Sequence, residues 1–112
     1  MDMSKHVRKR LEYVKSIIVQ YHKRRETPEE ALCGLDKREY NAVHAAVDLT
    51  ERMENGLDRL KVVDMTLWRG THTLAGAAME VYQSERTARR WRSEFVKMVE
   101  QIFSLIFKNW PF

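Results

Sequence analysis

The sequence predicts an all-α fold of four or five helices. Apolar residues recur at spacings of three and four along most of the chain, which is the period of an amphipathic helix. Only 4 Gly and 2 Pro occur among 112 residues, whereas an all-β chain needs both at its turns. A chain of this length supports one modest hydrophobic core. We therefore expect one compact helical domain.

The first helix is expected over residues 4–23. Its apolar side chains share one side of the helix: Val7, Leu11, Val14, Ile17, Ile18 and Tyr21. A break follows at residues 24–28. The stretch Thr27-Pro28-Glu29-Glu30 then offers an N-cap, a proline at the first helical position and a glutamate at the capping-box position. A short helical turn is predicted from there to Gly34.

Two further helices follow. The second is expected after the cap Asp36, and Asn55-Gly56 would end it with left-handed residues. Its apolar stripe consists of Tyr40, Val43, Val47, Leu49 or Thr50, and Met53. The third is expected from Leu57 or Asp58 to Trp68, with Arg69-Gly70 closing it. We divide the domain into residues 1–56, a supporting or oligomerising region, and residues 57–112, which carry the functional segment.

The segment from Thr73 to about Phe95 fits a helix-turn-helix. Such a motif packs two helices over a tight turn, and the first helix needs a small residue where the second crosses it. Ala78 meets that need, and Ser84 is a good N-cap for the second helix. The turn would be Tyr82-Gln83. Because Tyr82 stands where glycine is usual, a left-handed backbone there would be strained or the turn built differently.

The second helix of this motif is predicted to be long, with a basic outer face. At about 100° per residue, one arc is apolar: Ala88, Trp91, Phe95, Met98, Val99, Ile102 and Ile106. The arc roughly opposite holds Arg86, Arg89, Arg90, Ser93 and Lys97. Arginine reads guanine edges or clamps phosphates, and serine and threonine do either more weakly. The predicted DNA-binding residues are Thr73, Ser84, Arg86, Thr87, Arg89, Arg90, Ser93 and Lys97. The alternative is a solvated basic face.

The segment 57–95 resembles a known group of proteins. It contains Leu-Asp-Arg-Leu-Lys-Val-Val-Asp-Met at 57–65, Thr-Leu-Ala-Gly-Ala-Ala at 73–78 and Ser-Glu-Arg-Thr-Ala-Arg-Arg-Trp-Arg-Ser-Glu-Phe at 84–95. These blocks resemble the RinA/ArpU group of phage late-gene transcription regulators, whose DNA-binding part is similar to sigma-factor region 4. The resemblance implies a phage or prophage regulator of late genes. It places Arg86, Thr87, Arg89 and Arg90 at base- and phosphate-contacting positions. RNA polymerase is a further candidate partner.

The charge distribution is compatible with a polyanionic partner, and double-stranded DNA is the partner that we predict. The net charge is +4, and residues 1–25 carry eight Lys and Arg against two Asp and Glu. Residues 26–60 carry four against nine, and residues 61–112 carry eight against five. Positive charge therefore flanks an acidic middle. The basic cluster Lys5, Arg8, Lys9 and Arg10 is either a second phosphate-binding surface or a solvated helix face.

Several function classes are disfavoured. Cys33 is the sole cysteine, so no internal disulfide or multi-cysteine zinc site is expected. The four histidines have no spacing that gathers two metal ligands on one helical turn, and no phosphate loop, paired-carboxylate motif or nucleophile elbow occurs. We expect no enzyme, cofactor or metal. Lacking a signal peptide or membrane span, the chain is expected in the cytoplasm.

The apolar end Ile102–Phe112 has two explanations. It either folds back on the first helix to complete the core, or it forms a surface for self-association; a membrane-surface anchor fits less well. We expect a homo-oligomer through this end or through the N-terminal helices. Two other functions stay open: a phage packaging component resembling a small terminase subunit, and a protein-interaction module that binds no DNA.

Overall fold

The computed structural model describes residues 2–24 and 34–106, and it shows the all-helical chain that the sequence predicts. The α-helices are α1 (Asp2–Arg24), α2 (Gly34–Glu51), α3 (Gly56–Val63), α4 (Leu74–Glu80) and α5 (Glu85–Ile106). A π-helical turn, η2 (Asp64–Trp68), continues α3. These ranges contain no strand. The helical turn predicted from Thr27 falls in 25–33, outside the described residues.

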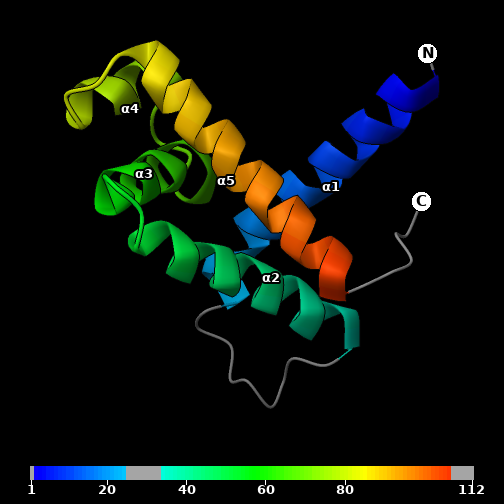
Figure 1. Ribbon diagram of the computed structural model, residues 1–112. Coiled ribbons are helices and arrows are strands. Elements are labelled where there is room, and N and C mark those ends of the chain that lie inside the picture. The colour runs from blue at the N-terminus through cyan, green and yellow to red at the C-terminus, as the bar shows by residue number, and fades with distance from the viewer. Residues whose placement is uncertain (1, 25–33, 107–112) are drawn as a thin grey trace.

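Helix α5 is the central element (Figure 1). It runs diagonally across the molecule, with α1 crossing behind it and α2 packed along its C-terminal half. Helices α3 and α4 pack near its N-terminal half. The sequence explains this central place, because α5 carries a continuous apolar side. Glu85 in its first turn interacts favourably with the helix dipole.

Two apolar clusters hold α5. The larger joins α1, α2, α3 and the C-terminal half of α5: Val14, Ile17, Ile18, Tyr21, Ala42, Val43, Ala46, Val63, Phe95, Val96, Val99 and Phe103. The smaller joins α3, η2, α4 and the start of α5: Val62, Met65, Ala77, Ala78, Val81, Ala88 and Trp91. Because α5 contributes to both clusters, packing holds both halves of the helix and leaves its outer face free of the core.

The junction between α2 and α3 corrects one expectation. Asn55 adopts the predicted left-handed conformation, with φ of 58°, but Gly56 does not and instead begins α3. Gly56 is buried, and a Cβ atom there would lie 2.4 Å from the carbonyl oxygen of Thr50. Glycine is therefore required here by close packing between helices, and Asn55 alone makes the left-handed turn. Thr50, one of two residues proposed for the apolar stripe, is buried, whereas Leu49 is exposed.

Two boundaries also differ from expectation. Helix α2 begins at Gly34, so Asp36 lies within its first turn and not before it. An aspartate is favoured at both places, which makes them hard to distinguish in a sequence. The third helix becomes π-helical at Asp64, where the amide of Arg69 donates to the Asp64 carbonyl oxygen at 2.7 Å. Gly70 closes this segment as predicted, with φ of 61°.

The end of α5 is only partly core. Phe103 is fully buried, and its ring centroid lies 5.6 Å from that of Tyr13 in α1. Leu105 is exposed, and Ile106, expected on the buried arc, is 42% exposed because the core cluster ends at Phe103. The apolar tail thus packs on α1 as far as Phe103. Its last six residues, 107–112, lie outside the described part of the chain.

Candidate nucleic-acid interface

A tight turn joins α4 to α5. The amide of Gln83 donates to the Ala78 carbonyl oxygen at 2.9 Å, and the amide of Tyr82 donates to that of Met79 at 3.2 Å. This pair of bonds is the Schellman pattern, which ends a helix with one left-handed residue. That residue is Tyr82, with φ of 57°. Its side chain is 93% exposed and therefore gains no burial that offsets the strained backbone.

Hydroxyl caps start both helices. Thr73 Oγ1 accepts a hydrogen bond from the Gly76 amide at 3.1 Å, at the start of α4. Ser84 Oγ accepts one from the Thr87 amide at 3.1 Å and donates to Thr87 Oγ1 at 3.0 Å, at the start of α5. Three of the predicted DNA-binding residues thus have a structural task. Thr73 and Ser84 are exposed at the two helix N-termini, where backbone amides favour anions.

Small residues let α4 approach α5 closely. Ala77, Ala78 and Ala88 are all buried, and they pack with Val81 and Trp91 in the smaller cluster. The expected role of Ala78 as the small residue at the helix contact agrees with its exposure of 2%. A larger side chain there would push α4 away from α5, because protein cores tolerate little added volume.

The outer face of α5 is exposed and basic. Arg86, Arg89, Arg90, Ser93 and Lys97 are all exposed, while Ala88, Trp91, Phe95 and Val99 on the other side are buried. Helix α5 thus has the basic and apolar sides that its sequence predicts. Thr87 is half-buried on the flank, beside its capping contact with Ser84.

Carboxylates already partner two of these arginines. Arg89 Nη2 lies 3.1 Å from Glu85 Oε1, and Arg90 Nε lies 3.8 Å from Glu94 Oε1. Such exposed pairs one turn apart contribute roughly 0.3–0.5 kcal/mol, so DNA can compete for the arginines. Among the residues that the structure describes, Arg86 and Lys97 make no ion pair or side-chain hydrogen bond. Arg86 and Lys97 are therefore the two cations on this face that no described carboxylate engages.

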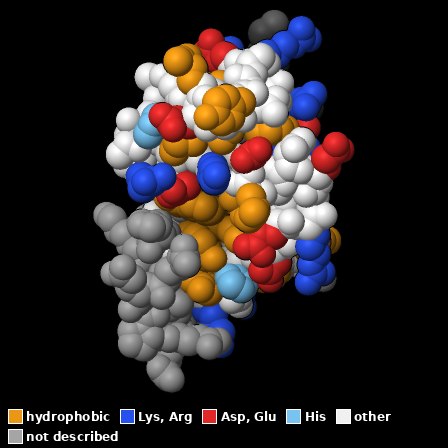
Figure 2. All heavy atoms as spheres, turned by 90° about the vertical axis from the view of Figure 1, so that its left-hand side faces the viewer, with side chains coloured by type: hydrophobic (Ala, Val, Ile, Leu, Met, Phe, Trp, Pro, Cys, Tyr) orange, Lys and Arg blue, Asp and Glu red, His pale blue; other side chains and the backbone are white. Residues whose placement is uncertain are grey.

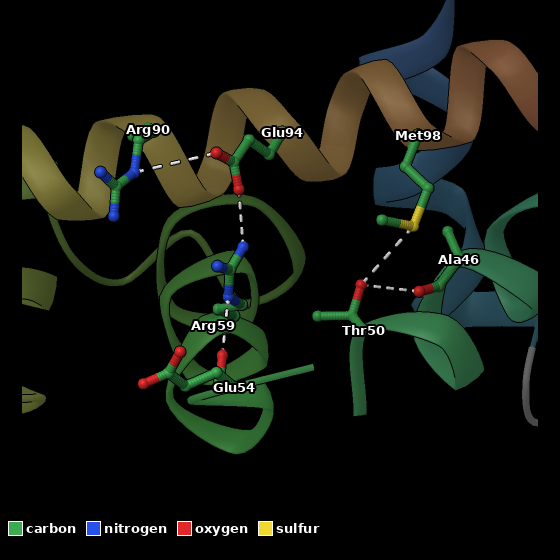
Figure 3. A network of polar contacts seen from close by, with 7 residues as sticks. All are labelled: Ala46, Thr50, Glu54, Arg59, Arg90, Glu94 and Met98. Atoms are coloured by element: carbon green, nitrogen blue, oxygen red, sulfur yellow. Dashed lines mark hydrogen bonds and ion pairs between the residues drawn. The ribbon is translucent and has the colours of Figure 1, made fainter. Parts of the chain in front are cut away.

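Arg59 of α3 contacts α5 next to this face. The sequence did not indicate this contact. Its Nη1 lies 2.6 Å from Glu94 Oε2, its Nε donates to the Glu54 carbonyl oxygen at 3.0 Å, and its guanidinium carbon lies 5.5 Å from the centre of the Trp91 ring. Figure 3 shows Glu94 between Arg59 and Arg90, so one carboxylate connects α3 to the exposed basic face of α5. No sequence pattern pairs residues 35 positions apart.

A groove with basic walls lies between α1 and α5, with a volume of about 210 Å³. Its described lining residues are Leu11, Lys15, Arg89, Arg92, Ser93, Val96 and Lys97. Arg92, which is half-buried, was not among the predicted residues because it lies between the basic and apolar arcs of α5. Burial and the charge of Arg89 lower the pKa of Arg92 below its usual value. Of the N-terminal cluster, Arg8 and Lys9 are exposed and Arg10 is half-buried.

A different side of the molecule is hydrophobic and acidic. A pocket of about 440 Å³ there is lined by Tyr21, Tyr40, His44, Val47, Asp48, Glu51, Leu60 and Trp68. Figure 2 shows a face with hydrophobic side chains at its centre and with Asp and Glu as well as Lys, Arg and His side chains around them. The carboxylates of Asp48 and Glu51 disfavour a polyanion at this pocket.

Comparisons with family models, curated proteins and solved structures give no match to this chain. No helix among the described residues is long and apolar enough to span a membrane. Within the same residues, no group of three or more His, Cys, Asp and Glu side chains is placed to hold a metal ion.

Proposed function

We propose that the chain is a sequence-specific DNA-binding protein in which α4, the turn at Tyr82 and α5 act as a helix-turn-helix. The observation that carries this proposal is the exposed row Arg86, Arg89, Arg90, Ser93 and Lys97 on a helix held from beneath by α4. From Arg86 to Lys97 the row is about 16 Å long at the rise of an α-helix. A basic helix of this size fits the major groove of B-DNA.

The residues on this face divide into two roles. Arg86, Arg89 and Arg90 lie in the first two turns of α5, the part of a recognition helix that contacts base edges. Ser93 and Lys97 lie further along and would contact phosphates. Thr73 and Ser84 would add phosphate contacts at the helix N-termini while they cap α4 and α5.

The resemblance of residues 57–95 to phage late-gene regulators favours transcription regulation as the biological form of this activity. In that role the chain would bind promoter DNA, with RNA polymerase as a further partner. Homo-oligomerisation stays a prediction, and the exposed Leu105 and Ile106 lie at the end of α5 where we expected it.

The test is selection of bound sequences from random duplex DNA, followed by affinity measurements on the enriched motif. Arg86→Ala should weaken binding to that motif by about 5- to 150-fold, since a base-contacting arginine contributes roughly 1–3 kcal/mol. Arg52→Ala is the matched control, because Arg52 is an exposed arginine in the turn after α2 and is not part of the outer face of α5. Absence of any enriched motif, or equal losses in both variants, would reject the assignment.

A further inference from the structure

The groove between α1 and α5 adds Lys15 and Arg92 to the cations of the outer face of α5. Four of its described lining residues are cationic, and none is acidic. Lys15 comes from α1, whereas Arg89, Arg92 and Lys97 come from α5. Two helices distant in the sequence therefore place like charges around one hollow, an arrangement that a bound anion would stabilise.

Of the four cations in the groove, Arg92 is the one whose charge is partly buried. It is half-buried, and within the described part of the chain its guanidinium makes no hydrogen bond or ion pair. Partial burial removes water from the cation, and Arg89 adds a second positive charge nearby; together these lower the pKa of Arg92. A desolvated cation with no partner destabilises the folded chain, and an anion in the groove would relieve that cost.

We propose that this groove binds a phosphate of the DNA backbone beside the bases that α5 reads, with Lys15 and Arg92 as its distinctive ligands. The proposal extends the proposed function and depends on it. Arg89, Ser93 and Lys97 belong to both the groove and the exposed face of α5, so a duplex on that face would bring its backbone to the groove. Helix α1 would thereby become part of the interface.

The chemistry of the groove suits a phosphate. Arginine offers forked N–H donors that match phosphate oxygens, lysine adds a point charge, and the Ser93 hydroxyl is a further donor. Leu11 and Val96 supply the apolar part of the lining, and of the cations only Arg92 is partly buried. Arg8 lies one turn before Leu11 and is exposed, so the row of α1 that lines the groove continues toward a neighbouring phosphate.

Contacts of this kind position the protein without reading sequence. Loss of one should therefore weaken binding to all duplexes alike and make binding less dependent on salt. The selected motif should stay the same, because the bases are read by other side chains. This separates the groove from Arg86, whose loss should change the preference among sequences.

The test uses the full chain with Lys15→Gln and, as matched control, Lys61→Gln. Lys61 is exposed and stands two positions after Arg59, which faces α5, so Lys61 points to the other side of α3. Lys15→Gln should lower the slope of log Kd against log salt by about 1, with equal losses on selected and scrambled duplexes. Lys61→Gln should leave slope and affinity unchanged. An unchanged slope in Lys15→Gln, with Arg86→Ala still defective, would overturn the groove proposal alone.

A second readout distinguishes DNA from a free anion. In the wild-type chain, the side-chain NMR signal of Arg92 should shift when duplex DNA is added, and millimolar inorganic phosphate should compete only weakly. Saturable binding of inorganic phosphate that DNA does not displace would overturn the DNA source and make the groove a small-anion site. Failure of the wild-type chain to bind any duplex at low salt would reject the groove proposal together with the proposed function.

Discussion

The left-handed conformation of Tyr82 leads to an unusual prediction about stability. Glycine usually destabilises a folded chain, but here we expect it to be stabilising. Tyr82→Gly should stabilise the protein, because Tyr82 has φ of 57° and a side chain that is 93% exposed. A residue with a Cβ atom costs roughly 1–2 kcal/mol in this conformation, and glycine does not. Glycine also gives the unfolded chain more conformational freedom, which offsets about 0.5–1 kcal/mol of this gain in stability. We expect a net gain of about 0.5–1 kcal/mol.

The assay is chemical and thermal unfolding of the wild type, Tyr82→Gly and Tyr82→Ala. Alanine is the matched control because it removes the same exposed ring and keeps the Cβ atom, so its stability should stay within about 0.5 kcal/mol of the wild type. For a domain of this size, the expected gain with glycine corresponds to a rise in Tm of about 2–4 °C. If Tyr82→Gly is no more stable than Tyr82→Ala, the turn does not have the Schellman geometry described above.

Two other predictions concern the supports of α5. Gly56→Ala should destabilise the fold by about 2 kcal/mol or more, since its Cβ would meet the Thr50 carbonyl oxygen at 2.4 Å; Gly76→Ala, with its nearest contact at 3.4 Å, should be tolerated, and equal effects in urea unfolding would refute the packing argument. Arg59→Ala should cost about 1–2 kcal/mol, because it removes the contacts with Glu94 and Trp91. A double-mutant cycle with Glu94→Gln should then show coupling between the two residues, and strict additivity would contradict the described ion pair.

Periodicity predicted the helices well because it reports which residues face a core. The stretch 4–23 became α1, and the opposite arcs of α5 separate buried from exposed residues much as its sequence suggests. The capping serine Ser84 and the strained position Tyr82 were also predictable, since caps and turns depend on a few neighbouring residues.

The rest depends on contacts between distant parts of the chain. The role of Gly56 was misassigned because only the approach of α2 to α3 shows that a side chain does not fit there. The bridge from Arg59 to Glu94 and the groove around Arg92 arise where α3 and α1 meet α5. Neither feature leaves a recognisable pattern among residues that are neighbours in the sequence. Arg92 in particular lies between the two arcs of α5, where helical geometry alone assigns it to neither.

The most direct test of the central claim is the ratio of affinities for the selected duplex and a scrambled duplex at one fixed salt concentration. If α5 reads bases through Arg86, the wild-type chain should prefer the selected duplex, and Arg86→Ala should lose most of that preference while it still binds both duplexes through phosphate contacts. The control Arg52→Ala should keep the wild-type ratio. A ratio near one in the wild type, or one that survives Arg86→Ala unchanged, would contradict the account.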